Sequence, residues 1–481
     1  MNRAIRHTWV AGVAIFTVLL LALTYVQFFA ARTLEAHPWN NRSLYDQFGA
    51  DRGAILVGGD AKAVSAPSDD DFEYQRVYAD PLMYGHLTGY FSLVYGATGL
   101  EAAMGEELSG ASDEQFYDRV VSMFSGDQPT GASVELTIDP VLQQTAHQLL
   151  EGRQGAIVAL DPETGAILAM VSSPGYDPNE LASHDSASVI AAAERLNADP
   201  AEPLVNRAIS GDLYAPASTF KIIDTVAALE SGEYTTESSI PNPQELPLPG
   251  TDVTLPNYVN GGCTARAEAD LEFALEQSCN TPFASIALDL GEDTIRRTAQ
   301  NFGYGEPLSV PLKVTPSVFP GELNDAQLAL SSIGQYDVRT TPLQVAMMSA
   351  AIANDGVMMK PQLVETVRSA DLSVIDEFTP EQLRRSTSAD VANVVTDLMV
   401  EVVDDGIARG AAVPGVEVAG KTGTAEIGSD EGLNDSWFTG FAPADDPRIA
   451  VAVVFEDVDV TTGSSLTTTS AKQLFEAVLN K

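Results

Sequence analysis

The sequence predicts an α+β protein that begins with one transmembrane helix. Three observations lead to this prediction: strand patterns stand at both ends of the segment 131–481, helix patterns lie between them, and a long apolar stretch opens the chain. Strands from the two ends of a segment can complete one antiparallel sheet, which helices then cover. We therefore expect an antiparallel sheet with flanking helices and an all-helical subdomain, preceded by a small membrane-proximal domain.

The opening apolar stretch, residues 8–31, carries no charged side chain and follows Arg3 and Arg6. As a helix it would extend about 36 Å, which exceeds the ~30 Å hydrocarbon core of a bilayer. Arginines favour the cytoplasmic side of a membrane, so the rest of the chain is expected outside the cytoplasm. The predicted location is the cell membrane, with a single span. A cleaved signal peptide is the alternative, although its apolar region is usually shorter.

Two segments follow this stretch. Residues 32–130 are rich in loops, contain no cluster of titratable side chains that looks catalytic, and are predicted to form a membrane-proximal non-catalytic domain. A regular rhythm then begins, with a strand over 133–138, a helix that starts at Asp139, and a β-hairpin over 156–171. Further strands are expected over 416–427, 435–442 and 448–455, and a closing helix over 470–479.

The net charge of −41, from Lys+Arg 26 against Asp+Glu 67, excludes some classes of partner. Such a surface repels polyanions, so neither nucleic acid nor anionic lipid is expected to bind. Adaptation to high salt would explain the charge, because salt screens the repulsion between carboxylates. Ordinary compositional bias is the alternative explanation.

Three short motifs occur in the second segment, in this order: Ser-x-x-Lys at Ser218 and Lys221, Ser-Cys-Asn at 278–280, and Lys-Thr-Gly at 421–423. Each motif alone is more often an ordinary surface feature. However, Lys221 is the only lysine with a serine three residues before it, and each of the other two motifs also occurs once. Together they indicate a serine acyl-enzyme that uses lysine, rather than histidine, beside its nucleophile.

Ser218 is the predicted nucleophile and Lys221 its general base. On a helix that we expect to end at Ser231, the two side chains share a face, and Ser218 lies at the positive end of the helix dipole. Lysine accepts a proton near neutral pH only when burial or a neighbouring cation lowers its pKa. Lys421 is the candidate cation.

The middle motif is expected in a loop between helices, where Ser278 relays a proton and Asn280 holds a substrate amide. The two cysteines, Cys263 and Cys279, lie in the predicted exported part of the chain, where disulfides persist. Their bridge would close a loop of about 15 residues and contribute on the order of 3 kcal/mol. Two buried thiols are the alternative.

The third motif is expected on a strand. Lys421 and the hydroxyls of Thr422 and Thr424 would bind a substrate carboxylate, and Gly423 would let the substrate lie against the strand. The backbone N–H groups of Ser218 and Thr424 are the predicted oxyanion hole. No histidine stands in a Gly-x-Ser-x-Gly context, and no cysteines and histidines have metal-ligand spacing, so we predict neither a catalytic triad nor a metal or other cofactor.

At these residues the chain resembles the penicillin-binding proteins, the transpeptidases of bacterial peptidoglycan. The resemblance covers nearly everything after the apolar stretch, and the part around Tyr84–Tyr90 and Cys279 is most similar to the actinobacterial penicillin-binding protein A group. Further matching stretches are Arg52–Ile55, Leu136–Asp139, Ala159–Met170, Tyr176–Asn179, Thr341–Gln344 and Trp437–Pro443.

This resemblance implies a penicillin-binding, β-lactamase-like transpeptidase domain over 131–481. The implied substrates are stem peptides ending in D-Ala-D-Ala, β-lactams are implied to acylate the same serine, and the implied role is cell-wall synthesis in growth and division. Residues 32–130 are too few for the glycosyltransferase module of bifunctional relatives, which implies a class B enzyme. A glycosyltransferase of the SEDS family and other elongation or division proteins would then be its membrane partners.

Two residues depart from the family pattern: Ala217 stands where the family usually has glycine, and Cys279 where aspartate is frequent. Alternative functions stay open at this point. A D,D-carboxypeptidase, a β-lactamase or β-lactam sensor, and a catalytically silent scaffold would all carry similar motifs.

Overall fold

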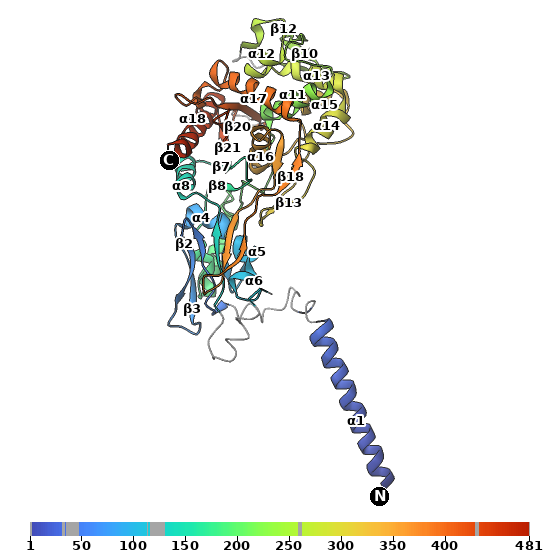
Figure 1. Ribbon diagram of the computed structural model, residues 1–481, viewed down its shortest axis with the longest axis vertical. Coiled ribbons are helices and arrows are strands. Elements are labelled where there is room, and N and C mark those ends of the chain that lie inside the picture. The colour runs from blue at the N-terminus through green and yellow to red at the C-terminus, as the bar shows by residue number, and fades with distance from the viewer. Residues whose placement is uncertain are drawn as a thin grey trace.

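The computed structural model describes residues 2–30, 34, 48–112, 114–115, 130–257, 262–428 and 432–480. Parts of the predicted segments, namely 31–33, 35–47, 113, 116–129, 258–261, 429–431 and residue 481, therefore lie outside the described residues. Figure 1 shows a separate N-terminal helix and a body in which a narrow base carries a larger, more helical part.

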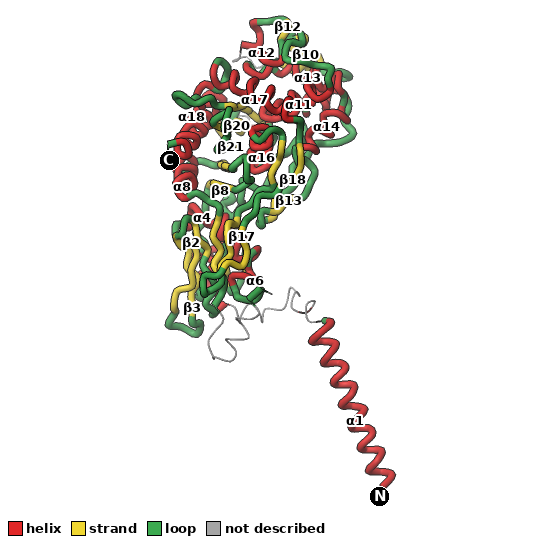
Figure 2. The backbone as a smooth tube through the Cα atoms, viewed as in Figure 1, coloured by secondary structure: helices red, strands yellow, loops and turns green. Residues whose placement is uncertain are grey.

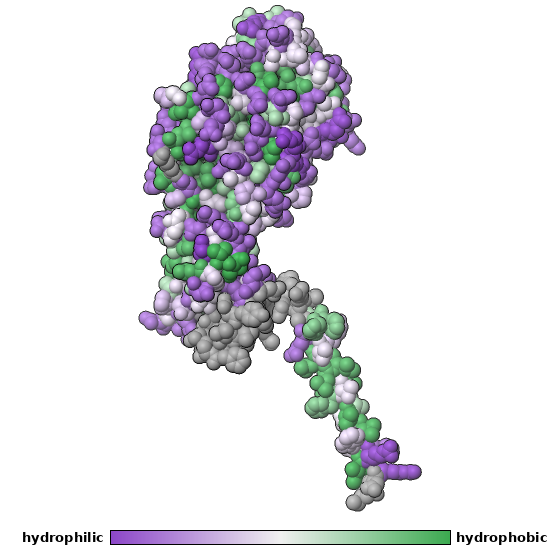
Figure 3. Space-filling model, viewed as in Figure 1, coloured by the Kyte–Doolittle hydropathy of each residue, from purple (hydrophilic) through white to green (hydrophobic). Residues whose placement is uncertain are grey.

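The N-terminal helix α1 (Asn2–Thr24) continues into a π-helical turn, η1 (Tyr25–Phe29). Within them, Ile5–Phe29 is long and apolar enough to cross a membrane, and none of its most apolar stretch is buried against the rest of the protein. Its surface is mostly hydrophobic in Figure 3, whereas the body shows a mixed, largely hydrophilic face.

The base is built on a six-stranded sheet with the order β17-β16-β6-β1-β2-β3. Its strands come from both sides of residue 130, so the first segment does not form this sheet by itself. The elements of the base are β1 (Ile55–Val57), β2 (Asp60–Pro67), β3 (Tyr74–Tyr78), α4 (Pro81–Thr88), β4 (Phe91–Ser92), β5 (Gly96–Ala97), α5 (Gly99–Ala103), α6 (Gly105–Leu108), β6 (Ser133–Leu136), β16 (Val364–Arg368) and β17 (Val374–Glu377).

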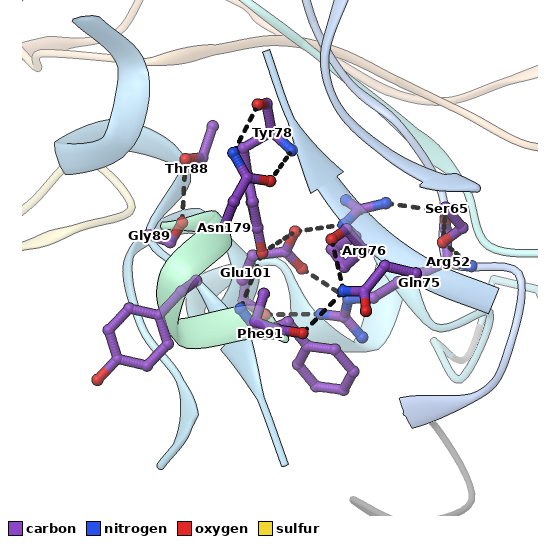
Figure 4. A network of polar contacts seen from close by, with 12 residues as sticks. Arg52, Ser65, Gln75, Arg76, Tyr78, Thr88, Gly89, Phe91, Glu101 and Asn179 are labelled. Atoms are coloured by element: carbon purple, nitrogen blue, oxygen red, sulfur yellow. Dashed lines mark hydrogen bonds and ion pairs between the residues drawn. The ribbon is translucent and has the colours of Figure 1, made fainter. Parts of the chain in front are cut away.

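A buried ionic cluster holds the base together (Figure 4). The carboxylate of Glu101 accepts hydrogen bonds from Nε of Arg52 and from Nε of Arg76, both at 2.6 Å. All three side chains are almost fully buried, and the hydroxyl of Tyr78 lies 3.3 Å from the same carboxylate. Although burial acts to raise the pKa of Glu101, Arg76 and Arg52 hold it below its usual range, so the cluster is ionised.

The central sheet of the upper part is antiparallel throughout, with the order β19-β20-β21-β7-β8. The first and last parts of the segment 131–481 meet where β21 pairs with β7, as the sequence predicts. The strands are β7 (Gly155–Leu160), β8 (Ile167–Ser173), β19 (Ala419–Glu426), β20 (Asn434–Ala442) and β21 (Ile449–Val458).

Helices cover both faces of this sheet. Phe438 of β20 packs against Phe475 of α18 (Val460–Leu479), and the next residue, Thr439, hydrogen-bonds to Ser349 of α16 (Pro342–Ala353). Successive strand residues point to opposite faces, so α16 and α18 lie on opposite sides. Helix α8 (Pro140–Leu150) packs beside α18. Helix α18 begins ten residues before its predicted start, because the side chain of Asp459 caps it.

Most of the remaining helices gather beside β19, in the part of the body that Figure 2 shows as mostly red, whereas the two helices between residues 179 and 198 pack on the base. The helices beside β19 carry the first two motifs. The elements of this part and its connections are α9 (Asn179–Ala182), α10 (Ser186–Ala198), η2 (Ala217–Phe220), α11 (Lys221–Ser231), η3 (Gly262–Ala265), α12 (Leu271–Glu276), α13 (Asn280–Leu290), α14 (Glu292–Asn301), α15 (Asp325–Ser331), α17 (Ala389–Asp404) and η4 (Arg409–Ala411), with the short strand pairs β9 (Ile240–Pro241) and β12 (Glu268–Ala269), β10 (Glu245–Pro247) and β11 (Thr254–Pro256), β13 (Leu308–Ser309) and β14 (Lys313–Val314), and β15 (Val357–Met359) and β18 (Gln382–Arg385).

Candidate active site

Ser218 lies in the 3₁₀ turn η2, and the α-helix α11 begins only at Lys221. The sequence predicted one helix from the serine onward. The difference has a local cause: both the backbone N–H and the hydroxyl of Thr219 donate to the carbonyl of Pro216, which closes a tight turn ahead of the helix. The helix then ends at Ser231, where Gly232 adopts the left-handed conformation, as predicted.

Lys221 is fully buried and points at the middle motif. Its Nζ donates to the carbonyl of Ser278 (2.8 Å) and to Oδ1 of Asn280 (2.8 Å), and lies 3.4 Å from the hydroxyl of Ser278. Burial, reinforced by the charge of Lys421, holds the pKa of Lys221 well below its usual range. Among the described residues, no hydrogen bond joins Nζ of Lys221 to Oγ of Ser218.

Lys421 approaches the same hydroxyl from the sheet. It lies on β19, is fully buried, and donates from Nζ to Oγ of Ser278 (2.8 Å) and to the carbonyl of Thr422 (3.1 Å). Burial lowers the pKa of Lys421 to about 7. The hydroxyl of Ser278 therefore lies between two lysine amines that lose their protons far more easily than an exposed lysine does.

The loop between α12 and α13 holds this arrangement. Ser278 has a left-handed backbone with φ of +55°, which is unusual for a residue other than glycine. A disulfide joins Cys279 to Cys263 of η3. Asn280 opens α13, and its Nδ2 donates to the carbonyl of Pro256 (3.0 Å).

The strand β19 is an edge strand of the central sheet. If Gly423 were replaced by a larger residue, its Cβ atom would lie 3.1 Å from the carbonyl oxygen of Pro216 and 3.2 Å from a methyl group of Thr219. These two atoms belong to the turn that carries Ser218, and Cβ of Trp437 would lie 3.2 Å away as well. A glycine at this position therefore lets the first and third motifs approach each other closely. The expected contact of substrate with Gly423 stays a prediction.

The predicted residues share one cleft of about 1270 Å³. Lys221 and Lys421 lie beneath its surface and reach it through their hydrogen bonds to the middle motif. The cleft is lined by Ser218, Ser278, Asn280, Thr422, Gly423 and Thr424, together with residues of the β10–β11 hairpin and of α18.

Two buried side chains near the motifs were missed by the sequence interpretation. Asp224 lies one turn after Lys221 on α11, is fully buried, and has no hydrogen-bond partner for either oxygen among the described residues. Burial raises its pKa well above the usual range, against the charge of Lys221. The sequence did contain a signal for Asp224, because a carboxylate there stands among the apolar positions of the predicted helix. Asn257, which contacts the middle motif, had no signal in the sequence.

Comparisons with known proteins show the family of the chain. Residues 155–480 match the model of the penicillin-binding protein transpeptidase domain, and residues 52–134 match that of the penicillin-binding protein A dimerisation domain. The chain is 43% identical to the peptidoglycan D,D-transpeptidase PbpA of Mycolicibacterium smegmatis, over 95% of this chain and 94% of that protein. The PbpA protein of Mycobacterium tuberculosis is 40% identical and is covered over 99% of its length.

Solved structures give the same result. The ceftriaxone acyl-enzyme complex of penicillin-binding protein A from M. tuberculosis superimposes with a TM-score of 0.86, at 40% identity, over 90% of this chain and 99% of that chain. The relatives are thus similar in sequence, in length and in fold. By its motifs, its fold and these matches, the chain belongs to the penicillin-binding protein transpeptidase family.

Proposed function

We propose that this protein is a peptidoglycan D,D-transpeptidase that cross-links stem peptides through a serine acyl-enzyme and is acylated by β-lactams at the same residue. The observation that carries the proposal is the meeting of three distant motifs: two buried lysine amines converge on the hydroxyl of Ser278, in a cleft that Ser218 also lines. The names of the similar proteins, peptidoglycan D,D-transpeptidases, support the reaction class.

In the first step, Oγ of Ser218 attacks the carbonyl carbon of the penultimate D-alanine. Lys221 takes the hydroxyl proton, which its lowered pKa permits at neutral pH. The backbone N–H groups of Ser218 and Thr424 stabilise the oxyanion. The peptide bond then breaks, terminal D-alanine leaves with a proton relayed through Ser278, and the ester on Ser218 remains.

In the second step, an amine of a neighbouring stem peptide attacks this ester. The amine loses a proton to the lysine and serine pair, the ester bond breaks, and Ser218 regains its hydroxyl. Thr422 and Thr424 hold the carboxylate of the donor peptide, which the charge of Lys421 attracts from beneath the cleft surface, and Asn280 donates to a backbone carbonyl of the substrate. No cofactor takes part in either step.

The N-terminal helix supports a single-pass anchor with the catalytic domain outside the cytoplasm, because Arg3 and Arg6 precede the apolar span. There the enzyme meets its polymeric substrate. A membrane glycosyltransferase of the SEDS family is the proposed source of the glycan strands, with other elongation or division proteins as further partners.

Labelling with fluorescent penicillin tests the nucleophile. Ser218→Ala should abolish covalent labelling, because the attacking oxygen is lost, while thermal unfolding stays close to that of the unchanged protein, since this side chain is only partly buried. Ser210→Ala, outside the cleft, is the matched control and should label normally. Persistent labelling of Ser218→Ala would place the nucleophile elsewhere. Product analysis with an added D-amino acid acceptor then separates transpeptidation from hydrolysis.

A further inference from the structure

We propose that Asn257 is a positioning residue for acylation: its side chain holds the first turn of α13 and thereby fixes Ser278 and Asn280 against the two lysines. This inference rests on the proposed function and adds to it a residue that belongs to none of the three motifs. Asn257 follows β11 directly and is 3% exposed.

The first part of the argument is the cap of α13. The residue before this helix, Cys279, provides no side-chain cap, because its sulfur is used in the disulfide. Instead, Oδ1 of Asn257 accepts hydrogen bonds from the backbone N–H groups of Asn280 (2.8 Å) and Thr281 (3.0 Å). The unpaired donors at the start of a helix need such an acceptor when they are buried. Here it comes from 23 residues earlier in the chain.

The second part is the other end of the same amide. Nδ2 of Asn257 lies within hydrogen-bond distance of Oδ1 of Asn242 (2.7 Å), the carbonyl of Pro243 (2.9 Å) and Oγ1 of Thr281 (2.9 Å). Because one end faces only N–H donors and the other faces acceptors, the orientation of the amide is fixed. Asn242, also buried, donates in turn to the carbonyl of Cys263 (2.7 Å).

The third part is the path from this network to the lysines. Nδ2 of Asn280 donates to the carbonyl of Pro256, the residue before Asn257, while Oδ1 of Asn280 accepts from Lys221. The end of β11 therefore sets both the backbone and the side chain of Asn280. A shift of this strand end would move Oδ1 of Asn280, which accepts from Lys221. It would also move the hydroxyl of Ser278, which lies next to the disulfide-bonded Cys279.

Asn257 itself does not line the cleft, whereas Leu248, Val253 and Leu255 of the same hairpin do. Loss of its side chain therefore leaves the surface that first meets a ligand in place, but releases the groups that must be aligned when Ser218 attacks. The expected effect falls on the acylation rate constant k2 and not on the dissociation constant Ks of the pre-covalent complex. Misplacing reacting groups by about 1 Å can cost ~10²-fold in rate.

The test uses the full chain and penicillin G in stopped-flow acylation, which yields k2 and Ks separately. Asn257→Ala should lower k2 by about 10²-fold and change Ks less than threefold. Asn257→Asp keeps an acceptor for the two N–H groups of α13 but sets a second oxygen against the acceptors that Nδ2 contacts, so its k2 should also fall.

Asn179→Ala is the matched control. The amide of Asn179 also pairs with backbone, accepting from the N–H and donating to the carbonyl of Tyr78 in the base, away from the cleft. It should lower the unfolding temperature and leave k2 unchanged. If Asn257→Ala does not fold, Asn257→Asp decides, with a lowered k2 at unchanged Ks expected.

The proposal is overturned if the folded Asn257 variants acylate at the unchanged rate, or if Asn179→Ala loses as much k2 as they do. Its failure is distinguishable from failure of the proposed function. If only the role of Asn257 is wrong, Ser218→Ala still abolishes labelling and the Asn257 variants label at full rate. If the proposed function is wrong, Ser218→Ala itself becomes labelled.

Discussion

At the scale of single residues, the cleft holds backbone conformations that are unfavourable for the side chains they carry. Ala217, Ser278 and Tyr336 have φ of +49°, +55° and +57°, and such conformations cost of order 1–3 kcal/mol each. The N–H of Ala217 donates to the carbonyl of Gly334, which keeps the turn before Ser218 in place. The departure from the glycine usual in the family therefore leaves the turn formed, at the expense of local strain.

The lowered pKa of Lys421 predicts that the binding of anionic ligands depends on pH. The pKa of Lys421 is about 7, so its positive charge is present below neutral pH and lost above it. The second-order constant k2/Ks reports the free enzyme. For penicillin G it should fall as pH rises through about 7, because the carboxylate of the ligand loses its cation and keeps only the hydroxyls of Thr422 and Thr424.

Penicillin G methyl ester, which lacks this carboxylate, is the control and should not show the alkaline decrease. Stopped-flow acylation between pH 6 and 9 measures both ligands. A decrease of equal size for acid and ester would mean that Lys421 does not bind the carboxylate.

At the scale of elements, the base depends on one buried carboxylate. Glu101→Gln leaves Arg52 and Arg76 buried beside a neutral amide, and removing one partner of a buried ionic cluster costs about 3–5 kcal/mol. We expect a large drop in the free energy of unfolding, measured by chemical denaturation.

The control for this prediction is Glu180→Gln, which breaks the exposed pair with Arg195. Exposed pairs contribute little, so this variant should stay close to the unchanged protein. Similar losses in the two variants would show that the buried cluster has no special role. Penicillin acylation of Glu101→Gln, measured at a temperature where it is folded, reports whether the base influences the cleft.

At the scale of the whole molecule, charge repulsion opposes folding. The net charge is −41, and one local example lies on α17, where burial and then Glu272, Asp405, Asp404 and Glu276 raise the pKa of Glu401. A carboxyl whose pKa is raised on folding contributes most to stability at low pH, and that contribution is lost as pH rises.

Salt should therefore stabilise this protein. At neutral pH, the unfolding temperature should rise from 0.1 M to 2 M sodium chloride, because the Debye length falls from about 10 Å to below 3 Å. Glu401→Gln removes one repelling charge, so its unfolding temperature should rise less with added salt than that of the unchanged protein. Sucrose at matched osmolality is the control for preferential exclusion. An unfolding temperature independent of salt would leave compositional bias as the explanation of the charge.

Much of the architecture was predictable, because it depends on short-range patterns. The continuous apolar runs of β7 and β8, the cap at Asp139 and the glycine after Ser231 are local signals, and each element formed where it was expected. The sequence did not predict the first ten residues of α18, because their threonines and serines are weak helix formers. This part of the helix is stabilised by its cap and by packing on the sheet.

By itself, the sequence determined the order of the three motifs, the antiparallel sheet made from both ends of the segment 131–481, and an apolar N-terminal helix. Only the tertiary structure decided that Lys221 and Lys421, 57 and 143 residues from Ser278, meet at its hydroxyl, and that Asn257 caps α13. The physical reason is the range of each interaction. Helix and strand periods are set by neighbours along the chain, whereas the partners of a buried polar group are set by how the whole chain packs.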